Sequence, residues 1–169
     1  NVLHCVCASS IPWEGLVRRI LREHKSAPLE VDCDGKTPLW ELLLNEQFSP
    51  QFSPHKSIIG TGLNNQESTN SNYADWKYET ACKIVRTCPE ATQSENAFRE
   101  DRIPLHFVLS QGWYDLAKLL HRYNPSQNGG MECEDKNGEL PLHAALEKKN
   151  QRMNEATIRW LVETYPDGP

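Results

Sequence analysis

The chain has 169 residues, a length that suits one ordinary globular domain or a short repeat array. Its net charge of -5 argues against non-specific nucleic-acid binding, which needs a positive field at the phosphates. We also expect no membrane insertion, because no apolar run approaches the roughly 20 residues of a membrane-spanning helix.

The first residues, NVLHCVCASS, lack the basic and apolar regions of a signal peptide and also lack an initiator Met. We therefore expect the sequence to begin inside a structural unit and to be a fragment of a longer array. The six cysteines are unevenly spaced, which favours reduced core thiols over three disulfides. We predict an intracellular protein, most simply cytoplasmic, with the nucleus left open.

Four short segments with one pattern recur along the chain. They are Leu3-His4, Thr37-Pro38-Leu39-Trp40, Ile103-Pro104-Leu105-His106 and Leu140-Pro141-Leu142-His143. Their last residues stand at positions 4, 40, 106 and 143, so the intervals are 36, 66 and 37 residues. A period of this size predicts stacked repeats, in which each unit buries its apolar face against its neighbours.

Each segment is followed by an apolar pair and by an anchor residue four positions after the first member of the pair. These sets are Ile20-Leu21 with His24, Ile84-Val85 with Cys88, Leu119-Leu120 with Tyr123, and Leu161-Val162 with Tyr165. The spacing predicts an amphipathic helix in each repeat. Pro89, Pro125 and Pro166 end the last three helices, since proline cannot continue a helix. We therefore predict an all-α fold of about four helix-turn-helix units, with first helices that begin at the Pro-Leu steps.

Two of the expected turns carry Asp and Gly three residues apart, at Asp32 and Gly35 and again at Asp135 and Gly138. An Asp side chain can bond its own backbone two residues on, and Gly supplies the positive φ that the turn requires. The pattern D-x-x-G-x-[TL]-P-L-[HW], followed by two short helices, resembles the ankyrin repeat. The third repeat departs from it, with Phe98 and Asp101 at the Asp and Gly positions.

The resemblance implies an ankyrin-like α-solenoid whose repeats are joined by β-turn or hairpin loops. We expect one array over residues 1–169, with repeats at about 1–31, 32–97, 98–134 and 135–169. The long second interval is explained by an insert at 47–73, whose composition predicts a flexible loop. The insert is either a tolerated surface loop or a docking segment whose Ser49 and Ser53, each followed by Pro, accept phosphate.

The histidines, cysteines and tryptophans that could form a catalytic or metal site are instead expected to have structural roles. His4, His106 and His143 occupy equivalent positions of separate repeats, so they stack without converging, and the family uses this His to bond neighbouring turns. The pattern His4-Cys5-x-Cys7 lacks a second pair at zinc-ligand spacing. Trp13, Trp40, Trp113 and Trp160 are expected in the core. No catalytic motif is present, so we expect no enzyme activity, no cofactor and no metal.

The resemblance implies a non-catalytic module that binds another protein through turn tips and first-helix faces. The implied partner-binding residues are Cys33, Asp34, Lys36 and Asn45 in the second repeat, Arg99, Glu100, Arg102, Ser110 and Gln111 in the third, and Lys136, Asn137, Glu139, Glu147 and Lys148 in the fourth. One alternative is a regulatory or substrate-recruiting arm of a larger enzyme or channel. Another is that these repeats only extend a longer solenoid.

Overall fold

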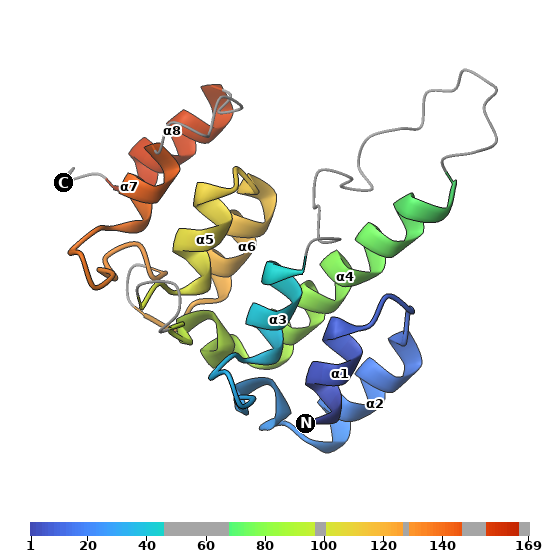
Figure 1. Cartoon of the computed structure of the whole chain (residues 1–169). Coiled ribbons are helices and arrows are strands. Elements are labelled where there is room, and N and C mark those ends of the chain that lie inside the picture. Colours follow the sequence, from blue (N-terminus) through green and yellow to red (C-terminus); the bar gives the residue numbers. More distant parts are fainter. Residues whose placement is uncertain (46–67, 97–100, 127–128, 147–154, 166–169) are drawn as a thin grey trace. The chain divides into compact units, whose positions relative to one another are not determined.

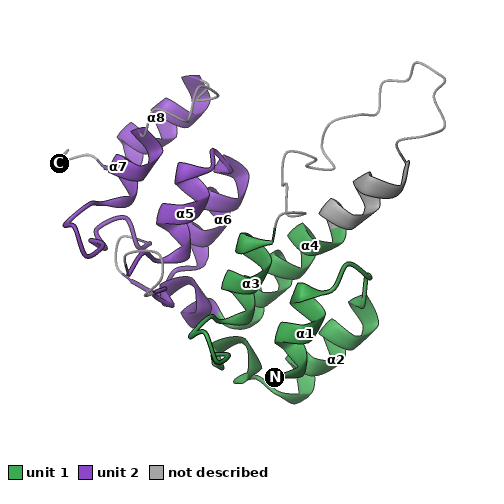
Figure 2. Ribbon diagram, viewed as in Figure 1, with its two compact units in different colours: residues 1–88 green, residues 89–169 purple. Residues whose placement is uncertain are grey.

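A computed structural model describes residues 1–45, 68–96, 101–126, 129–146 and 155–165. These residues form helices and connecting loops and include no named β-strand, which confirms the all-α class for the described part of the chain. The chain divides into two compact units (Figure 2).

Unit 1 covers Asn1–Cys88 and contains two helix pairs (Figure 1). Its elements are α1 (Val2–Ala8), α2 (Glu14–Glu23), the short 3-10 helix η1 (Ala27–Leu29), α3 (Pro38–Leu44) and α4 (Ser68–Thr87). Helix α1 packs against α3, and α2 packs against α4, so the first pair lies beside the second. Leu3, Val17 and Leu39 are fully buried and form part of the core.

Unit 2 covers Pro89–Pro169 and contains four further α-helices among its described residues. Its elements are η2 (Pro89–Gln93), α5 (Pro104–Ser110), α6 (Tyr114–Tyr123), α7 (Pro141–Leu146) and α8 (Glu155–Thr164). Helix α5 packs against both α6 and α7, and α8 reaches α6 through a ring contact. Trp160 of α8 meets the His121 ring of α6 edge to face, with 5.9 Å between the ring centroids.

The first helices begin where the sequence predicts. Helices α3, α5 and α7 start at Pro38, Pro104 and Pro141. Proline costs no hydrogen bond there, because the first N–H of a helix has no partner within the helix. Helix α1 lacks the proline and is capped instead by Asn1, whose Oδ1 accepts the Leu3 N–H at 2.8 Å.

The second helices all end in the same way. A backbone N–H just past the helix donates to the carbonyl four residues earlier, from His24 to Ile20, Cys88 to Ile84, Asn124 to Leu120 and Tyr165 to Leu161. The repeat pattern in the sequence aligned Leu119-Leu120 with Ile20-Leu21. The helix ends instead align Leu120 with Ile20, so the predicted alignment is wrong by one residue. Helix α6 continues to the residue before Asn124, because Pro125 is the first residue that cannot extend it.

The insert predicted at 47–73 is shorter than expected at its C-terminal end. Helix α4 begins at Ser68, so residues 68–73 are helical and Trp76 lies well inside the helix. Once a helix has formed, each added residue gains a backbone hydrogen bond at little cost, even in a polar sequence. Residues 47–67, with Ser49 and Ser53, lie outside the described residues.

The aromatic and sulfur side chains separate into buried and exposed groups. Trp40 is fully buried, as expected, whereas Trp13 is exposed. The prediction fails for Trp13, which stands at the N-cap of α2, and Trp113 and Trp160 are only half-buried. All six cysteines lie in the described residues and are free thiols, and Cys7, Cys82 and Cys88 are buried.

Candidate protein-binding surface

The turn before α3 is organised by one carboxylate. Oδ1 of Asp32 accepts the backbone N–H groups of Asp34 and Lys36, both at 2.9 Å. The Asp32 backbone carbonyl accepts the Gly35 N–H at 3.1 Å, and its N–H donates to the Lys36 carbonyl at 3.0 Å. Gly35 has a φ of 71°, a left-handed conformation that glycine adopts without strain. The turn therefore holds its shape through hydrogen bonds within its own loop, from the Asp32 side chain as well as from the backbone.

The turn before α7 repeats this arrangement at Asp135. Its Oδ1 accepts the N–H groups of Asn137 at 2.8 Å and Glu139 at 3.0 Å, and Gly138 has a φ of 75°. Here the other carboxylate oxygen also accepts from Nε of Arg102 at 2.9 Å. A second Arg102 nitrogen lies 2.9 Å from the Glu139 carboxylate. One arginine thus ties two successive turns of unit 2 together.

The turn before α5 differs from the other two. Asn96 pairs with Arg102 through an isolated bridge, in which the Asn96 N–H donates to the Arg102 carbonyl at 3.2 Å. Asp101 has a φ of 56° and donates its N–H to the Asn96 carbonyl at 3.1 Å. Asp101 thus adopts a left-handed conformation at the position where the other two turns have Gly. The turn closes on Asn96, two residues before the position at which Asp was expected.

Two of the aligned histidines bond to neighbouring turns. Nε2–H of His4 donates to the Lys36 carbonyl at 2.8 Å, and Nε2–H of His106 donates to the Glu139 carbonyl at 3.0 Å. His143 instead accepts the Leu140 N–H at its Nδ1, 2.9 Å away. Each bonded ring fixes a first helix to the turn that follows. In the described ranges, no group of His, Cys, Asp or Glu could hold a metal ion.

Three of the four candidate residues of unit 1 lie around the tip of the turn before α3. Cys33 and Asp34 are exposed, and Asn45 is half-buried at the end of α3. Lys36 is half-buried, with Nζ 3.3 Å from the Asp34 carboxylate and 3.9 Å from that of Glu41. The tip therefore offers a thiol and an acidic group, beside a lysine that is held by acidic neighbours.

The candidate residues of unit 2 divide by exposure. Gln111, Lys136 and Asn137 are exposed. Arg102 is held between two carboxylates, and Ser110 is buried with its hydroxyl on the Phe107 carbonyl at 2.8 Å. Glu139 is half-buried in the Arg102 pair. The four others, Arg99, Glu100, Glu147 and Lys148, lie outside the described residues.

Two opposing effects act on the pKa of each turn carboxylate. Burial alone would raise the pKa of Asp32, but hydrogen bonds from the Lys36 and Asp34 backbones outweigh it, so the pKa is lowered. At Asp135 burial is again outweighed, here by the Glu139 backbone and by the Arg102 side chain, and the pKa is lowered. Both carboxylates thus stay ionised and keep their turns bonded at neutral pH.

Sequence reasoning missed a buried lysine in α4. The Lys77 side chain is fully buried, and its Nζ has no hydrogen-bond partner among the described residues. Burial lowers the pKa of the ammonium group, although the charges of Cys7 and Glu41 partly offset this. Counting back from the shared helix ends, Lys77 stands where α2 and α6 have Trp13 and Trp113 at their N-caps. A lysine at a repeat position that elsewhere holds tryptophan is the sequence signal that could have identified this residue.

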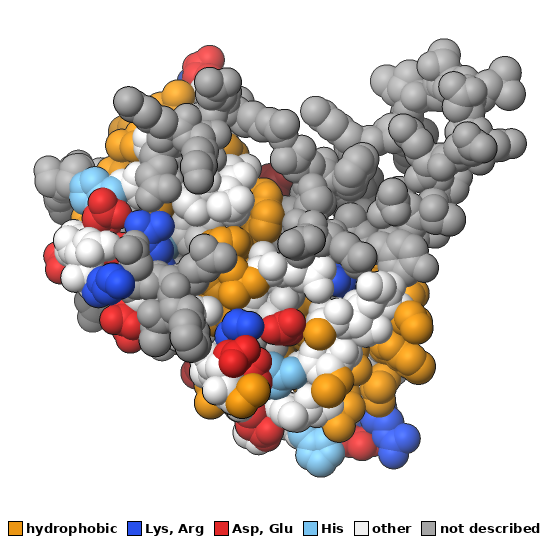
Figure 3. Space-filling model, in the orientation of Figure 1, with side chains coloured by type: hydrophobic (Ala, Val, Ile, Leu, Met, Phe, Trp, Pro, Cys, Tyr) orange, Lys and Arg blue, Asp and Glu red, His pale blue; other side chains and the backbone are white. Residues whose placement is uncertain are grey.

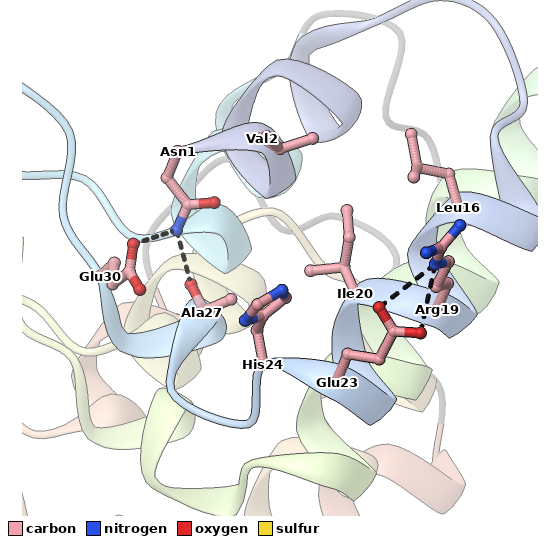
Figure 4. Close-up of a pocket in the computed structure, with 9 residues that line it drawn as sticks. All are labelled: Asn1, Val2, Leu16, Arg19, Ile20, Glu23, His24, Ala27 and Glu30. Carbon is pink, nitrogen blue, oxygen red and sulfur yellow. Dashed lines mark hydrogen bonds and ion pairs between the residues drawn. The ribbon is translucent and has the colours of Figure 1, made fainter.

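A pocket that the sequence did not predict lies on the first helix pair. It has a volume of 420 Å³ and is lined by Asn1, Val2, Leu16, Arg19, Ile20, Glu23, His24, Ala27 and Glu30 (Figure 4). Its floor is apolar, and its rim carries the Arg19–Glu23 ion pair at 3.2 Å. It lies apart from the turn tip of unit 1, on residues of α1, α2 and η1.

No protein-family model matches the chain, and no curated protein matches its sequence closely enough to count as a relative. Across the described residues, no helix combines the length and the apolar character needed to cross a membrane.

Proposed function

We propose that the chain is an ankyrin-like array that binds another protein through the tips of its turns and the neighbouring first helices. The observation that carries the proposal is the pair of turns at Asp32 and Asp135. Each is held by the same backbone hydrogen bonds, while the residues at its tip remain exposed. A well-bonded turn with an exposed tip suits recognition, because little conformational entropy is lost when it binds.

The exposed tips define the surface to be tested. In unit 1 the tip is Cys33 and Asp34, and in unit 2 it is Lys136 and Asn137. The two tips differ in charge, so the partner should present groups of both signs, and its association should weaken at high salt. Arg102 is left out of this surface because its charge is already satisfied within unit 2.

The proposal is tested by replacing the tips and comparing captured partners quantitatively. The tip variant carries Asp34→Lys and Lys136→Glu, which reverse two exposed charges. The matched control carries Arg18→Glu and Glu163→Lys, which reverse two exposed charges on the second helices. We expect proteins cross-linked to the wild type in cells to be depleted at least tenfold with the tip variant and retained with the control.

Circular dichroism and urea unfolding should show that both variants fold like the wild type, because surface substitutions usually change stability by less than about 0.5 kcal/mol. If the tip variant captured the same proteins as the wild type, the proposed binding surface would be wrong.

A further inference from the structure

The buried lysine of α4 stands where this helix departs from the other second helices. Helices α2, α4, α6 and α8 end at the same repeat position, as their last hydrogen bonds show. Helix α4 has 20 residues, whereas α2, α6 and α8 have 10 residues each. The extra length therefore lies at the N-terminal end of α4, and Lys77 is its last residue.

Lys77 differs from the other basic residues in its surroundings. On the face drawn in Figure 3, Lys and Arg side chains reach the surface, where water solvates their charge. Lys83 of the same helix lies with its Nζ 3.2 Å from the Glu79 carboxylate and 4.0 Å from the Glu14 carboxylate of α2. Lys77 is fully buried, and within the described ranges its Nζ makes no hydrogen bond and no ion pair. A buried ammonium group without a partner is costly, so the packed helix favours the neutral amine.

The ionisable groups that act on Lys77 do not compensate its charge. The charge of Glu41 in α3 favours the ammonium form, but the Glu41 carboxylate also lies 3.9 Å from the Lys36 ammonium group. Cys7 of α1 could compensate only as a thiolate. Burial raises the pKa of the Cys7 thiol far above its usual range, so the thiol stays neutral.

Two more polar atoms beside Lys77 are buried without a partner among the residues that the structure describes. They are Nε1 of Trp76 and Oγ1 of Thr80. Trp76 and Thr80 are one helical turn apart and therefore lie on one side of α4. A buried donor that makes no hydrogen bond favours an open state in which water satisfies it. This part of α4 thus gains hydrogen bonds when it leaves its neighbours.

We propose that uptake of a proton by Lys77 releases α4 from α2 and α3 and uncovers the Cys82 thiol, so that unit 1 responds to pH. While the amine is neutral, α4 stays packed on these two helices. The ammonium form needs water, which reaches Nζ when the helix leaves its neighbours. Cys82 is buried on the same helix, little more than one turn after Lys77, and the same movement exposes it. The release involves unit 1 alone and requires no partner at the turn tips.

The direction of the pH effect follows from the two states. In the open state the Lys77 amine has its ordinary pKa of 10.5, and in the packed state burial lowers this pKa. As the pH falls below 10.5, the open state therefore takes up a proton more readily and gains population. The gain is at most about tenfold per pH unit, and it stops at the pKa of the packed state.

Competitive thiol labelling of the full chain tests the proposal. The chain is treated briefly with iodoacetamide, and mass spectrometry measures the labelling rate of Cys82 relative to that of Cys33, an exposed thiol of the same unit. The ratio of the two rates removes the common effect of pH on thiolates. In the wild type this ratio should rise as the pH falls from about 10 to about 7, because the open state becomes more populated.

Variants of the two lysines of α4 assign the effect. Lys77→Met keeps an unbranched side chain and removes the amine, so its labelling ratio should be lower than that of the wild type at pH 7 and independent of pH. Lys77→Gln repeats this test with a second neutral side chain. Lys83→Met is the matched control, because Lys83 is on the same helix but is paired, and it should keep the wild-type pH dependence. Circular dichroism verifies that each variant is folded.

Three results would overturn the proposal. One is a wild-type ratio that is the same at every pH. Another is a ratio that changes with pH in Lys77→Met and Lys77→Gln as much as in the wild type. The third is Cys82 labelling that depends on urea as steeply as global unfolding does, because the release of one helix exposes less surface than the unfolding of the chain.

Discussion

Units 1 and 2 build the same turn from the same two residue types but hold it with different neighbours. Asp32 is half-buried and is bonded by its own loop, whereas Asp135 is buried and also binds Arg102 from the preceding turn. An Asp and a Gly three residues apart therefore specify the backbone of the loop. Whether the loop is also fastened to its neighbour depends on a side chain more than thirty positions away.

The largest expected effect of this difference is on stability. Asp135→Ala leaves Arg102 beside a single, partly exposed carboxylate and removes two backbone bonds, so it should cost about 3–5 kcal/mol. Asp32→Ala removes two backbone bonds but no buried ion pair, and should cost about 1–2 kcal/mol. Hydrogen exchange measured by mass spectrometry on residues 135–146 and 32–44 reports the two turns separately.

Arg102→Gln distinguishes the ion pair from the backbone bonds. It should account for the greater part of the difference between the two aspartates, because it removes the pair and leaves the turn carboxylate in place. Equal losses for Asp32→Ala and Asp135→Ala would show that Arg102 contributes nothing to the turn.

The sequence predicted one end of several helices because proline marks it. Pro38, Pro104 and Pro141 begin first helices, and Pro125 follows the end of α6. It failed where no such marker exists. Nothing before Trp76 signals that α4 starts at Ser68, and the apolar residues Leu119 and Leu120 allowed two alignments of α6. The ankyrin-like interpretation itself stays a prediction.

The candidate site was less predictable because exposure depends on tertiary neighbours. Lys136 and Arg102 are both basic residues assigned to the candidate surface, yet only Lys136 is exposed to a partner. The motif gives both the same role, and only the packing of α5 on α7 brings Arg102 to Asp135. Asn96 was missed for a similar reason, since it closes a longer loop outside the motif.

A smaller difference between the units should appear on acidification. Burial lowers the pKa of His106 below its usual 6.5, and the bond to the Glu139 carbonyl and the charge of Asp135 offset this only in part. The unfolded chain therefore takes up a proton more readily than the folded one. Unit 2 should lose stability as the pH falls below about 6.5, by at most about 1.4 kcal/mol per pH unit, until the folded pKa is reached.

His106→Gln tests this origin, since the amide N–H can still donate to the Glu139 carbonyl but does not titrate. Urea midpoints of the variant between pH 7 and pH 5 should fall less steeply than those of the wild type. Identical slopes would assign the acid sensitivity to carboxylates instead.

The smallest expected effect concerns the left-handed residue of each turn. At Gly35 a Cβ would meet no atom within 4 Å, so Gly35→Asp should cost about 1 kcal/mol through backbone strain alone. Asp101 already bears that strain at a φ of 56°, and Asp101→Gly should return part of it, below about 1 kcal/mol. The two changes move in opposite directions at equivalent turn positions, and chemical denaturation measures both. If Asp101→Gly destabilised the protein, the exposed Asp101 carboxylate would have to make a contact that is worth more than the strain. The turn before α5 would then be held by its side chains, as the turn at Asp135 is.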